Sequence, residues 1–147
     1  MPGIVCAIRG GPSSQPTIER AMALARETDL PLHFLYVVNL DFLAHTSSSR
    51  VKVITHELHQ MGDFILLNAK TQAEAGGIHA HGDVRQGSVM EEIISLCHEI
   101  EAKYVVLGSP SGVHEDDLFT LERIRQFAER IEHESGATVI LAERGEL

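Results

Sequence analysis

Apolar residues along this chain follow two alternating patterns: short runs, and longer stretches with one apolar residue every three or four positions. The runs lie at residues 3–8, 31–40, 103–109 and 137–143, and a more polar segment of strand character lies at 78–84. Such runs are typical of strands in a parallel sheet that helices cover on both faces. The periodic stretches predict amphipathic helices. The pattern therefore predicts five strands alternating with four helices.

Four sets of apolar residues at helical spacing mark the predicted helices. They are Ile18, Ala21, Met22 and Ala25 in the first helix, Val51, Ile54, Leu58, Met61, Ile65, Ala69 and Ala73 in the second, Val89, Ile93, Leu96, Cys97 and Ile100 in the third, and Leu121, Ile124, Ala128 and Ile131 in the fourth. We expect Ser14 to cap the first helix, with Pro16 in its first turn. Glycine ends the second and fourth helices, within residues 75–77 and 135–136.

The alternation of strands and helices predicts an α/β fold: a five-stranded, doubly wound parallel sheet with helices on both faces, forming one domain over residues 1–147. The polar third strand is expected near a sheet edge. Ligands of such sheets bind beyond the carboxyl ends of the strands, where the strand order reverses. The relevant strand tips are residues 8–11 and 108–112.

Composition narrows the class of protein. The 147 residues are 44% hydrophobic and 22% charged, with a formal net charge of -9 and a pI near 5.4. Such an acidic chain is not expected to bind nucleic acid or an anionic membrane, and no apolar run is long enough to span one. The two cysteines, Cys6 and Cys97, lie in apolar segments without CxxC spacing, and the first residues do not have the pattern expected of a secretory leader. We expect buried, reduced thiols and a cytoplasmic protein.

Several segments together resemble the universal stress protein family, over essentially the whole chain. The segment IVCAIRGGPSS followed by ERAMALA is similar to the family's first strand, turn and alanine-rich helix. LHFLYVV, VRQGSVMEEI and ATVILAE follow where the family has its second strand, the turn into its third helix and its last strand, although the last lacks the usual proline. EAKYVVLGSPSG stands where the family has an Ala-Asp-hydrophobic-Gly-Ser stretch. The order and spacing of these segments carry the resemblance.

The resemblance implies a five-stranded fold of the adenine nucleotide alpha hydrolase type. It also implies a homodimer, often paired through the last strand, and a role in stress survival or signalling without a known catalysed reaction. Many members of the family bind ATP or AMP and others bind neither, so the resemblance alone leaves the ligand open.

Both halves of the family's nucleotide signature are altered here. Nucleotide-binding members end the first strand with an aspartate that contacts adenosine, whereas this chain has Arg9, which only donates hydrogen bonds. Arg9 could still contact a phosphate, or it could be an exposed arginine in an ion pair at the rim. The family's phosphate loop has a Gly-x-x-Gly pattern followed by a Gly-Ser or Gly-Thr pair, but Gly108 and Gly112 are one residue too far apart and no second pair follows. The acidic run at 115–117 would repel phosphates.

The resemblance and the sheet geometry together give one candidate set of ligand-binding residues: Ala7, Arg9, Gly10, Val38, Gly87, Gly108, Ser109, Gly112 and Thr120. We expect a non-catalytic regulatory or stress-response protein with a degenerate nucleotide site and no required cofactor. The alternative is a sensor that binds ATP or AMP through Arg9, Ser109 and Thr120. A nucleotide-hydrolysing enzyme, with a metal held near Asp116 or Asp117, is a third hypothesis. We expect a homodimer and an unidentified protein partner.

Two further patterns have simpler explanations. Residues 9–14, RGGPSS, are similar to the Ser-Gly-Gly-x-Asp-Ser loop of ATP pyrophosphatases, but Arg9 replaces the first serine and Ser13 the aspartate. His79 and His81 lie on one face of the third predicted strand, and His56 and His59 lie one turn apart on the long helix. Neither pair has an evident third ligand, so we expect surface histidines and no metal site.

Overall fold

The computed structural model describes residues 2–10, 14–40, 47–108 and 118–142, and within 118–121 the backbone alone. The described elements are β1 (Ile4–Ala7), α1 (Gln15–Thr28), β2 (Leu32–Val38), α2 (Ser48–Ala75), β3 (Ala80–Gln86), α3 (Val89–Ile100), β4 (Tyr104–Gly108), α4 (Leu118–Ser135) and β5 (Thr138–Ala142). The predicted alternation of strands and helices is confirmed.

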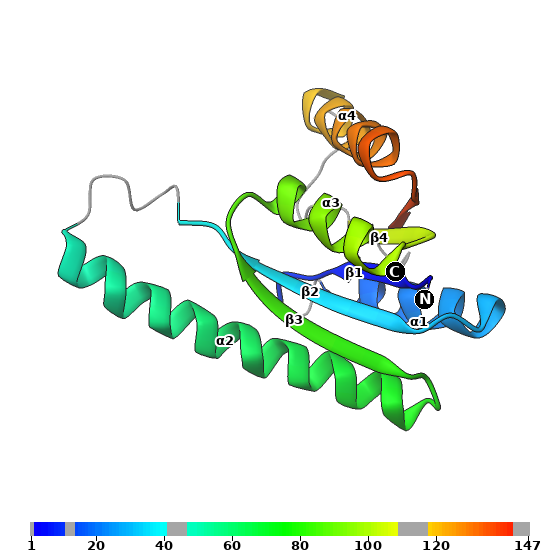
Figure 1. Cartoon of the computed structure of the whole chain (residues 1–147), viewed down its shortest axis with the longest axis horizontal. Helices are drawn as coiled ribbons and strands as arrows, with labels where there is room; N and C mark the ends of the chain where they lie inside the picture. Colours follow the sequence, from blue (N-terminus) through cyan, green and yellow to red (C-terminus); the bar gives the residue numbers. More distant parts are fainter. Residues whose placement is uncertain (1, 11–13, 41–46, 109–117, 143–147) are drawn as a thin grey trace.

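All five strands are parallel and form one sheet in the order β3-β2-β1-β4-β5 (Figure 1). The central strand β1 pairs with both β2 and β4, so that Val5 lies opposite His33 on one side and Val105 on the other. The polar strand β3 lies at one edge, as its composition predicted. The strand order reverses between β1 and β4, which places the switch point at the middle of the sheet.

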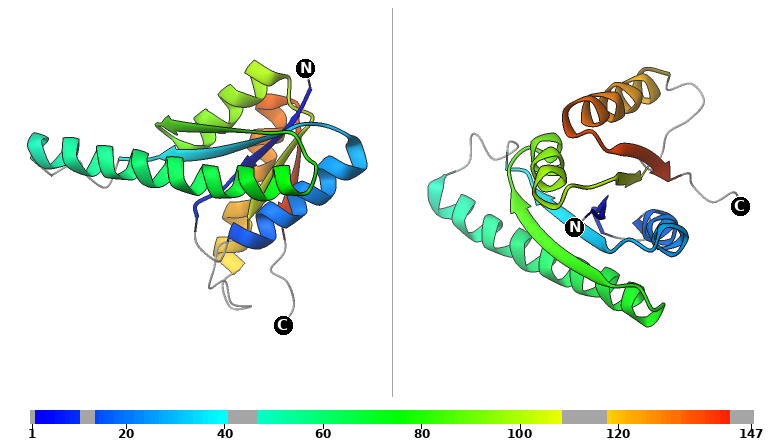
Figure 2. Two further views of the ribbon diagram at one scale, coloured as in Figure 1. Left: turned by 90° about the horizontal axis from the view of Figure 1, so that it is seen from below. Right: turned by 45° about the vertical axis from the view of Figure 1, so that its right-hand side comes forward.

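Two hydrophobic cores hold the helices to the sheet. One core joins α1 and α2 to the face that carries Ile4, Cys6 and Phe34, and the other joins α3 and α4 to the face that carries Val5 and Leu35. Figure 2 shows the two pairs of helices on opposite faces of the sheet. The alternation of inward and outward side chains along each strand explains why neighbouring residues belong to different cores. Both cysteines are buried, as predicted.

The helix α2 is longer than the sheet that it covers, and its first half extends beyond the carboxyl ends of the strands (Figure 1). Its buried residues are Gly62, Leu66, Ala69 and Ala73, all in its second half. The prediction that Met61 belongs to the buried stripe is wrong, since its side chain is 52% exposed. Ala69 and Ala73 of the predicted stripe are buried, but nearer the middle of the helix the buried residues are Gly62 and Leu66, each one position beyond the predicted Met61 and Ile65. The small side chains among the buried residues let the helix approach the strands.

The start of α1 also differs from its prediction. Ser14 occupies the cap position, but its hydroxyl makes no capping hydrogen bond to the helix. Instead, Ser14 Oγ donates a hydrogen bond of 3.1 Å to the carbonyl oxygen of Gly10. The side chain therefore links the start of α1 to Gly10 near the tip of β1, while Pro16 lies in the first turn of the helix as expected.

Candidate ligand-binding site

A pocket of about 630 Å³ opens at the switch point, beyond the carboxyl ends of the central strands. This is the position at which doubly wound sheets bind their ligands. Its described lining residues are Ala7, Ile8, Arg9, Leu35, Tyr36, Val37, Val38, Asn39, Leu58, Val89, Leu107, Gly108, Arg123, Ile124, Phe127 and Leu141. We call this cavity the switch-point pocket.

Four strands and three helices build the switch-point pocket. The ends of β1, β2, β4 and β5 form its floor, and α2, α3 and α4 add Leu58, Val89 and Phe127 respectively to its walls. Leu58 comes from the half of α2 that extends past the strands, so the overhanging helix closes one side of the cavity. Most lining side chains are apolar. Such a lining favours a ligand with apolar surface, placed by a few polar groups.

The structure brings four of the predicted site residues together. Ala7, Arg9, Val38 and Gly108 all line the pocket, whereas Gly10 and Gly87 do not appear among its lining residues. Ser109 and Gly112 lie outside the described residues, as do Ser13 and the acidic run at 115–117. Thr120 falls within α4, but its side chain is not described.

Two glycines allow close approach of the elements around the pocket. Gly10 has a φ of +88°, a backbone conformation that L side chains rarely adopt, and a Cβ there would collide with the Cδ1 atom of Ile65 on α2. A Cβ on Gly108 would collide with Oγ1 of Thr17 in the first turn of α1. The predicted glycines therefore shape the site, because α1 and α2 can pack directly against the strand tips.

Arg9 lies at the tip of β1 with its side chain exposed and makes no ion pair with another described residue. The rim ion pair considered from the sequence is therefore absent among the described residues. No aspartate or glutamate is found among the described lining residues. As far as the structure describes the lining, this position offers hydrogen-bond donors and positive charge, and no carboxylate acceptor.

The second arginine of the pocket, Arg123, was missed by the sequence analysis. It comes from α4, five residues into the helix, and faces the pocket beside Ile124 and Phe127. Tyr36 and Asn39 are also polar lining residues that the sequence analysis did not name. Only the positions of Asn39 and Arg123 in the sequence could have indicated that they line the pocket. Asn39 follows the end of β2, and Arg123 lies one helical turn beyond Thr120.

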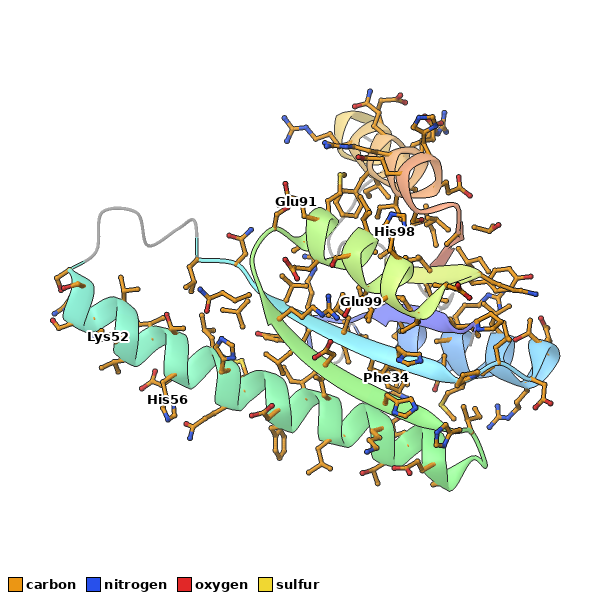
Figure 3. All side chains as sticks on the ribbon, viewed as in Figure 1. Phe34, Lys52, His56, Glu91, His98 and Glu99 are labelled. Atoms are coloured by element: carbon orange, nitrogen blue, oxygen red, sulfur yellow. The ribbon has the colours of Figure 1, made fainter. Side chains whose placement is uncertain are left out.

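Three histidines outside the pocket, His33, His79 and His81, form a cluster. The sequence placed only His79 and His81 together. The ring of His81 on β3 stacks on His33 of β2, with centroids 4.8 Å apart, and meets His79 edge-on at 4.7 Å. His59 contacts the side chain of Gln86 at 3.3 Å, while His56 points away from the fold on the overhanging part of α2 (Figure 3). Within the described residues, no group of three or more His, Cys, Asp or Glu side chains has an arrangement that could hold a metal ion.

A second polar cluster joins the edge strand β3 to α3. Arg85 Nε lies 2.7 Å from Asp83 Oδ2, and Arg85 Nη2 lies 2.5 Å from Glu99 Oε2. Figure 3 places Glu99 on the side of α3 that faces the strands. Burial alone would lower the pKa of Arg85, but its hydrogen bonds to the two carboxylates raise it. None of these three residues lines the pocket, and the ion pair between Arg85 and Glu99 holds the edge strand β3 to α3.

The sequence of this chain is similar to that of proteins of known family. The family model of the universal stress protein family matches residues 2–141. The chain belongs to the universal stress protein family. A universal stress protein of Methanocaldococcus jannaschii is 25% identical over 107 residues, which cover 72% of this chain and 63% of that relative. The chain thus matches less than two thirds of the relative's length.

Solved structures agree on the fold. A universal stress family protein from Burkholderia pseudomallei superposes with a TM-score of 0.69 at 19% identity, covering 95% of this chain and 94% of the other. A universal stress protein solved in complex with cAMP gives a TM-score of 0.68 at 17% identity, with 95% of each chain covered. In the part of the chain that the structure describes, no helix is long and apolar enough to cross a membrane.

Proposed function

We propose that this universal stress protein is a non-catalytic regulatory protein of the stress response, and that its switch-point pocket has lost the nucleotide-binding mode found in many family members. One observation carries the proposal: the first-strand tip on the pocket wall is Arg9, and the described lining contains no carboxylate. An adenosine ribose offers hydroxyl donors that seek an acceptor, and a guanidinium cannot supply one. Buried polar groups left without partners weaken binding.

The proposal also includes the oligomeric state of the protein and its location in the cell. We propose a homodimer that pairs through the open edge of β5, because an edge strand leaves a row of backbone hydrogen-bonding groups unpaired. We also propose a cytoplasmic location, which the two buried free thiols support, since structural thiols persist in reducing compartments. The protein partner that such a regulator would contact is not specified by these features.

The second candidate function is a nucleotide sensor that binds ATP or AMP. It is favoured by the relative of known structure that was solved with cAMP, and by a pocket of about 630 Å³ at the switch point. Under this alternative Arg9 would contact a phosphate, because guanidinium groups bind phosphate oxygens in a bidentate manner. The two candidates differ in whether adenine nucleotides bind at all.

The first test is to denature freshly purified protein and identify the released small molecules by mass spectrometry, followed by calorimetric titration with ATP and magnesium. We expect no stoichiometric adenine nucleotide and no binding heat. Near-stoichiometric ATP or AMP would overturn the proposal in favour of the sensor. Turnover of ATP that requires metal and is lost in Asp116→Asn or Asp117→Asn would instead support an enzyme.

A gain-of-function variant tests the role of Arg9 directly. Arg9→Asp restores an acceptor at the strand tip, and a hydrogen bond to a charged group is worth about 1.5–3 kcal/mol, so we expect adenosine to bind at least about tenfold more tightly than to the unaltered protein. Adenosine is the probe because it lacks phosphates and isolates this end of the site. Arg50→Asp, an exposed position in the first turn of α2, is the matched control for the change in charge. Equal affinities in all three proteins would contradict the assignment of Arg9 to the adenosine contact.

A further inference from the structure

The switch-point pocket combines an apolar lining with positive charge, and this combination points to a class of ligand. Its walls include Ile8, Val38, Leu58, Val89, Leu107 and Phe127. Two of the chain's 12 basic residues, Arg9 and Arg123, line the same cavity, while none of its 21 acidic residues appears among the described lining. Among the described lining residues, positive charge is therefore in excess, and such an excess favours an anionic ligand even in a protein of net charge -9.

The two arginines approach the cavity from different parts of the fold. Arg9 follows the central strand β1, and Arg123 belongs to α4 on the face of the sheet that α3 also covers. A guanidinium presents its donors in a planar fork that matches the two oxygens of a carboxylate or a phosphate. Two forks from separate elements can fix the head of one ligand, while the apolar walls take up the rest of it.

The remaining lining residues disfavour a ligand whose body, meaning the part beyond its charged head, is polar. Beyond the arginines, the described side chains with hydrogen-bonding groups are Tyr36 in β2 and Asn39, which directly follows that strand. A ribose placed against the isoleucine, valine and leucine side chains would lose its hydration without gaining partners there. An alkyl chain or an aromatic ring would gain from the same surface, at about 25 cal/mol per Å² removed from water.

We propose that the switch-point pocket binds an organic anion with one carboxylate or phosphate head and an apolar body, and that Arg9 and Arg123 hold the head. The inference rests on the proposed function, because it assumes that the site no longer binds nucleotides in the family's manner. It goes further by naming the chemistry of the ligand that replaces them. The body of the ligand contacts the wall that Leu58 and Val89 form.

The position of Leu58 gives the ligand a second, structural effect. None of the residues of α2 before Gly62 is buried, so the first half of this helix has little tertiary contact to stabilise it. A ligand that covers Leu58 adds such contact. Binding is therefore expected to slow amide hydrogen exchange in residues 50–61, whereas α1, which contributes no residue to the described pocket lining, changes little.

The test is isothermal titration calorimetry with decanoate as the probe, compared with decanol and decyltrimethylammonium. We expect decanoate to bind at least about tenfold more tightly than either comparison compound. Arg9→Gln and Arg123→Gln should each weaken decanoate binding about tenfold or more. Arg125→Gln is the matched control, because Arg125 lies on the same helix, is 72% exposed and does not line the pocket. Its affinity should equal that of the unaltered protein.

A parallel titration with 2-naphthoate separates two forms of the body. Binding of naphthoate with the same dependence on Arg9 and Arg123 supports the inference with an aromatic body, and preferential binding of decanoate supports it with an alkyl chain. Slower exchange in residues 50–61 on saturation with the bound probe supports the placement against Leu58.

The inference is overturned if no organic anion binds, if decanol binds as well as decanoate, or if neither arginine variant weakens binding. Unchanged exchange in residues 50–61 at saturation would overturn it as well, because the ligand would then lie elsewhere. These failures leave the proposed function standing. Stoichiometric ATP in the purified protein is the separate result that would remove the proposed function itself.

Discussion

At the scale of single residues, His33 of β2 lies beside two other histidines, and positive charge on its own ring is disfavoured. Burial is the largest cause that lowers the pKa of His33, and its neighbours His81 and His79 lower it further, while Asp83 opposes them. A Cβ on Gly3 would meet Cδ2 of His33 at 3.1 Å and Cδ1 of Ile100 at 3.4 Å, so the apolar end of α3 lies near the His33 ring. The fold therefore holds this imidazole in its neutral form more strongly than water does.

Acidification should consequently destabilise the fold through His33. The unfolded chain takes up a proton near the ordinary pKa of 6.5, whereas folded His33 does so only at lower pH. The unfolded state thus binds more protons below about pH 6.5, and the free energy of unfolding falls as the pH falls. A difference of one bound proton changes the free energy of unfolding by at most about 1.4 kcal/mol per pH unit. Because His33 is only half-buried, solvent screening keeps its effect well below this limit.

The measurement is urea denaturation of the protein between pH 7.5 and 5.5, with His33→Gln as the variant. We expect a smaller decrease in unfolding free energy over this range in His33→Gln than in the unaltered protein. His98→Gln, at an exposed position on α3, is the control and should keep the full decrease. An identical pH dependence in His33→Gln would show that the stacked histidines do not couple to folding.

At the scale of elements, α2 shows why a periodic sequence can predict a helix and still misplace its buried face. The helix carries apolar residues on more than one side, since Met61, Phe64 and Leu67 are exposed while Leu66 is buried. Periodicity alone cannot choose between overlapping stripes. The deciding feature is size, because Gly62, Ala69 and Ala73 are small enough to bring the helix against β2 and β3.

Gly62 gives this argument a test. Alanine is the better helix former by about 1 kcal/mol, so helix propensity predicts that Gly62→Ala stabilises the protein. A Cβ at this position would lie 2.6 Å from Cδ1 of Tyr36 and 3.2 Å from Cγ2 of Val84. Overpacking of this kind costs about 1–3 kcal/mol, so we expect Gly62→Ala to lower the free energy of unfolding by about 1 kcal/mol.

Thermal and urea denaturation measure the effect, with Asp63→Ala as the control. Asp63 is the next residue and is exposed, so its replacement should change stability by less than about 0.5 kcal/mol. A Gly62→Ala protein more stable than the unaltered one would mean that α2 does not pack this closely on Tyr36.

The candidate site was predictable only in part, because some of its residues are placed by the way in which helices and strands pack together. Strand order and glycine positions located the tips of β1 and β4, so Ala7, Arg9, Val38 and Gly108 could be named in advance. Arg123 and Leu58 enter the pocket because of the angles at which α4 and α2 dock on the sheet, and no local pattern encodes those angles. The His33–His81 contact likewise depends on the β2–β3 register, which pairs the two residues.

At the scale of the whole molecule, the sheet has two edges that differ in character. Asp83 and Arg85 of the edge strand β3 are charged, and Arg85 is tied to α3 through Glu99, which makes a poor surface for pairing with another strand. The edge strand β5 is apolar in its middle, with Val139, Ile140 and Leu141 in sequence. The asymmetry favours β5 as the edge through which two copies pair.

The backbone of β5 specifies a variant that tests this pairing. Thr138 donates its N–H to Lys103 beside β4, so the alternation along the strand turns the N–H groups of Val139 and Leu141 toward the open edge. The N–H of Val139 already donates to Oε2 of Glu132 at 3.1 Å. Leu141→Pro removes the other outward donor while leaving the pairing with β4 in place, and edge strands tolerate proline.

We expect the protein to sediment at twice the mass of one chain, Leu141→Pro to sediment as a monomer, and Leu141→Ala to remain dimeric because it keeps the backbone N–H. Analytical ultracentrifugation at micromolar concentration makes the comparison, and far-ultraviolet circular dichroism confirms that the variants fold. A monomeric unaltered protein would contradict the homodimer. A dimer that survives Leu141→Pro would place the interface elsewhere, and the exposed Phe64 and Leu67 on the outer face of α2 would then be the next surface to alter.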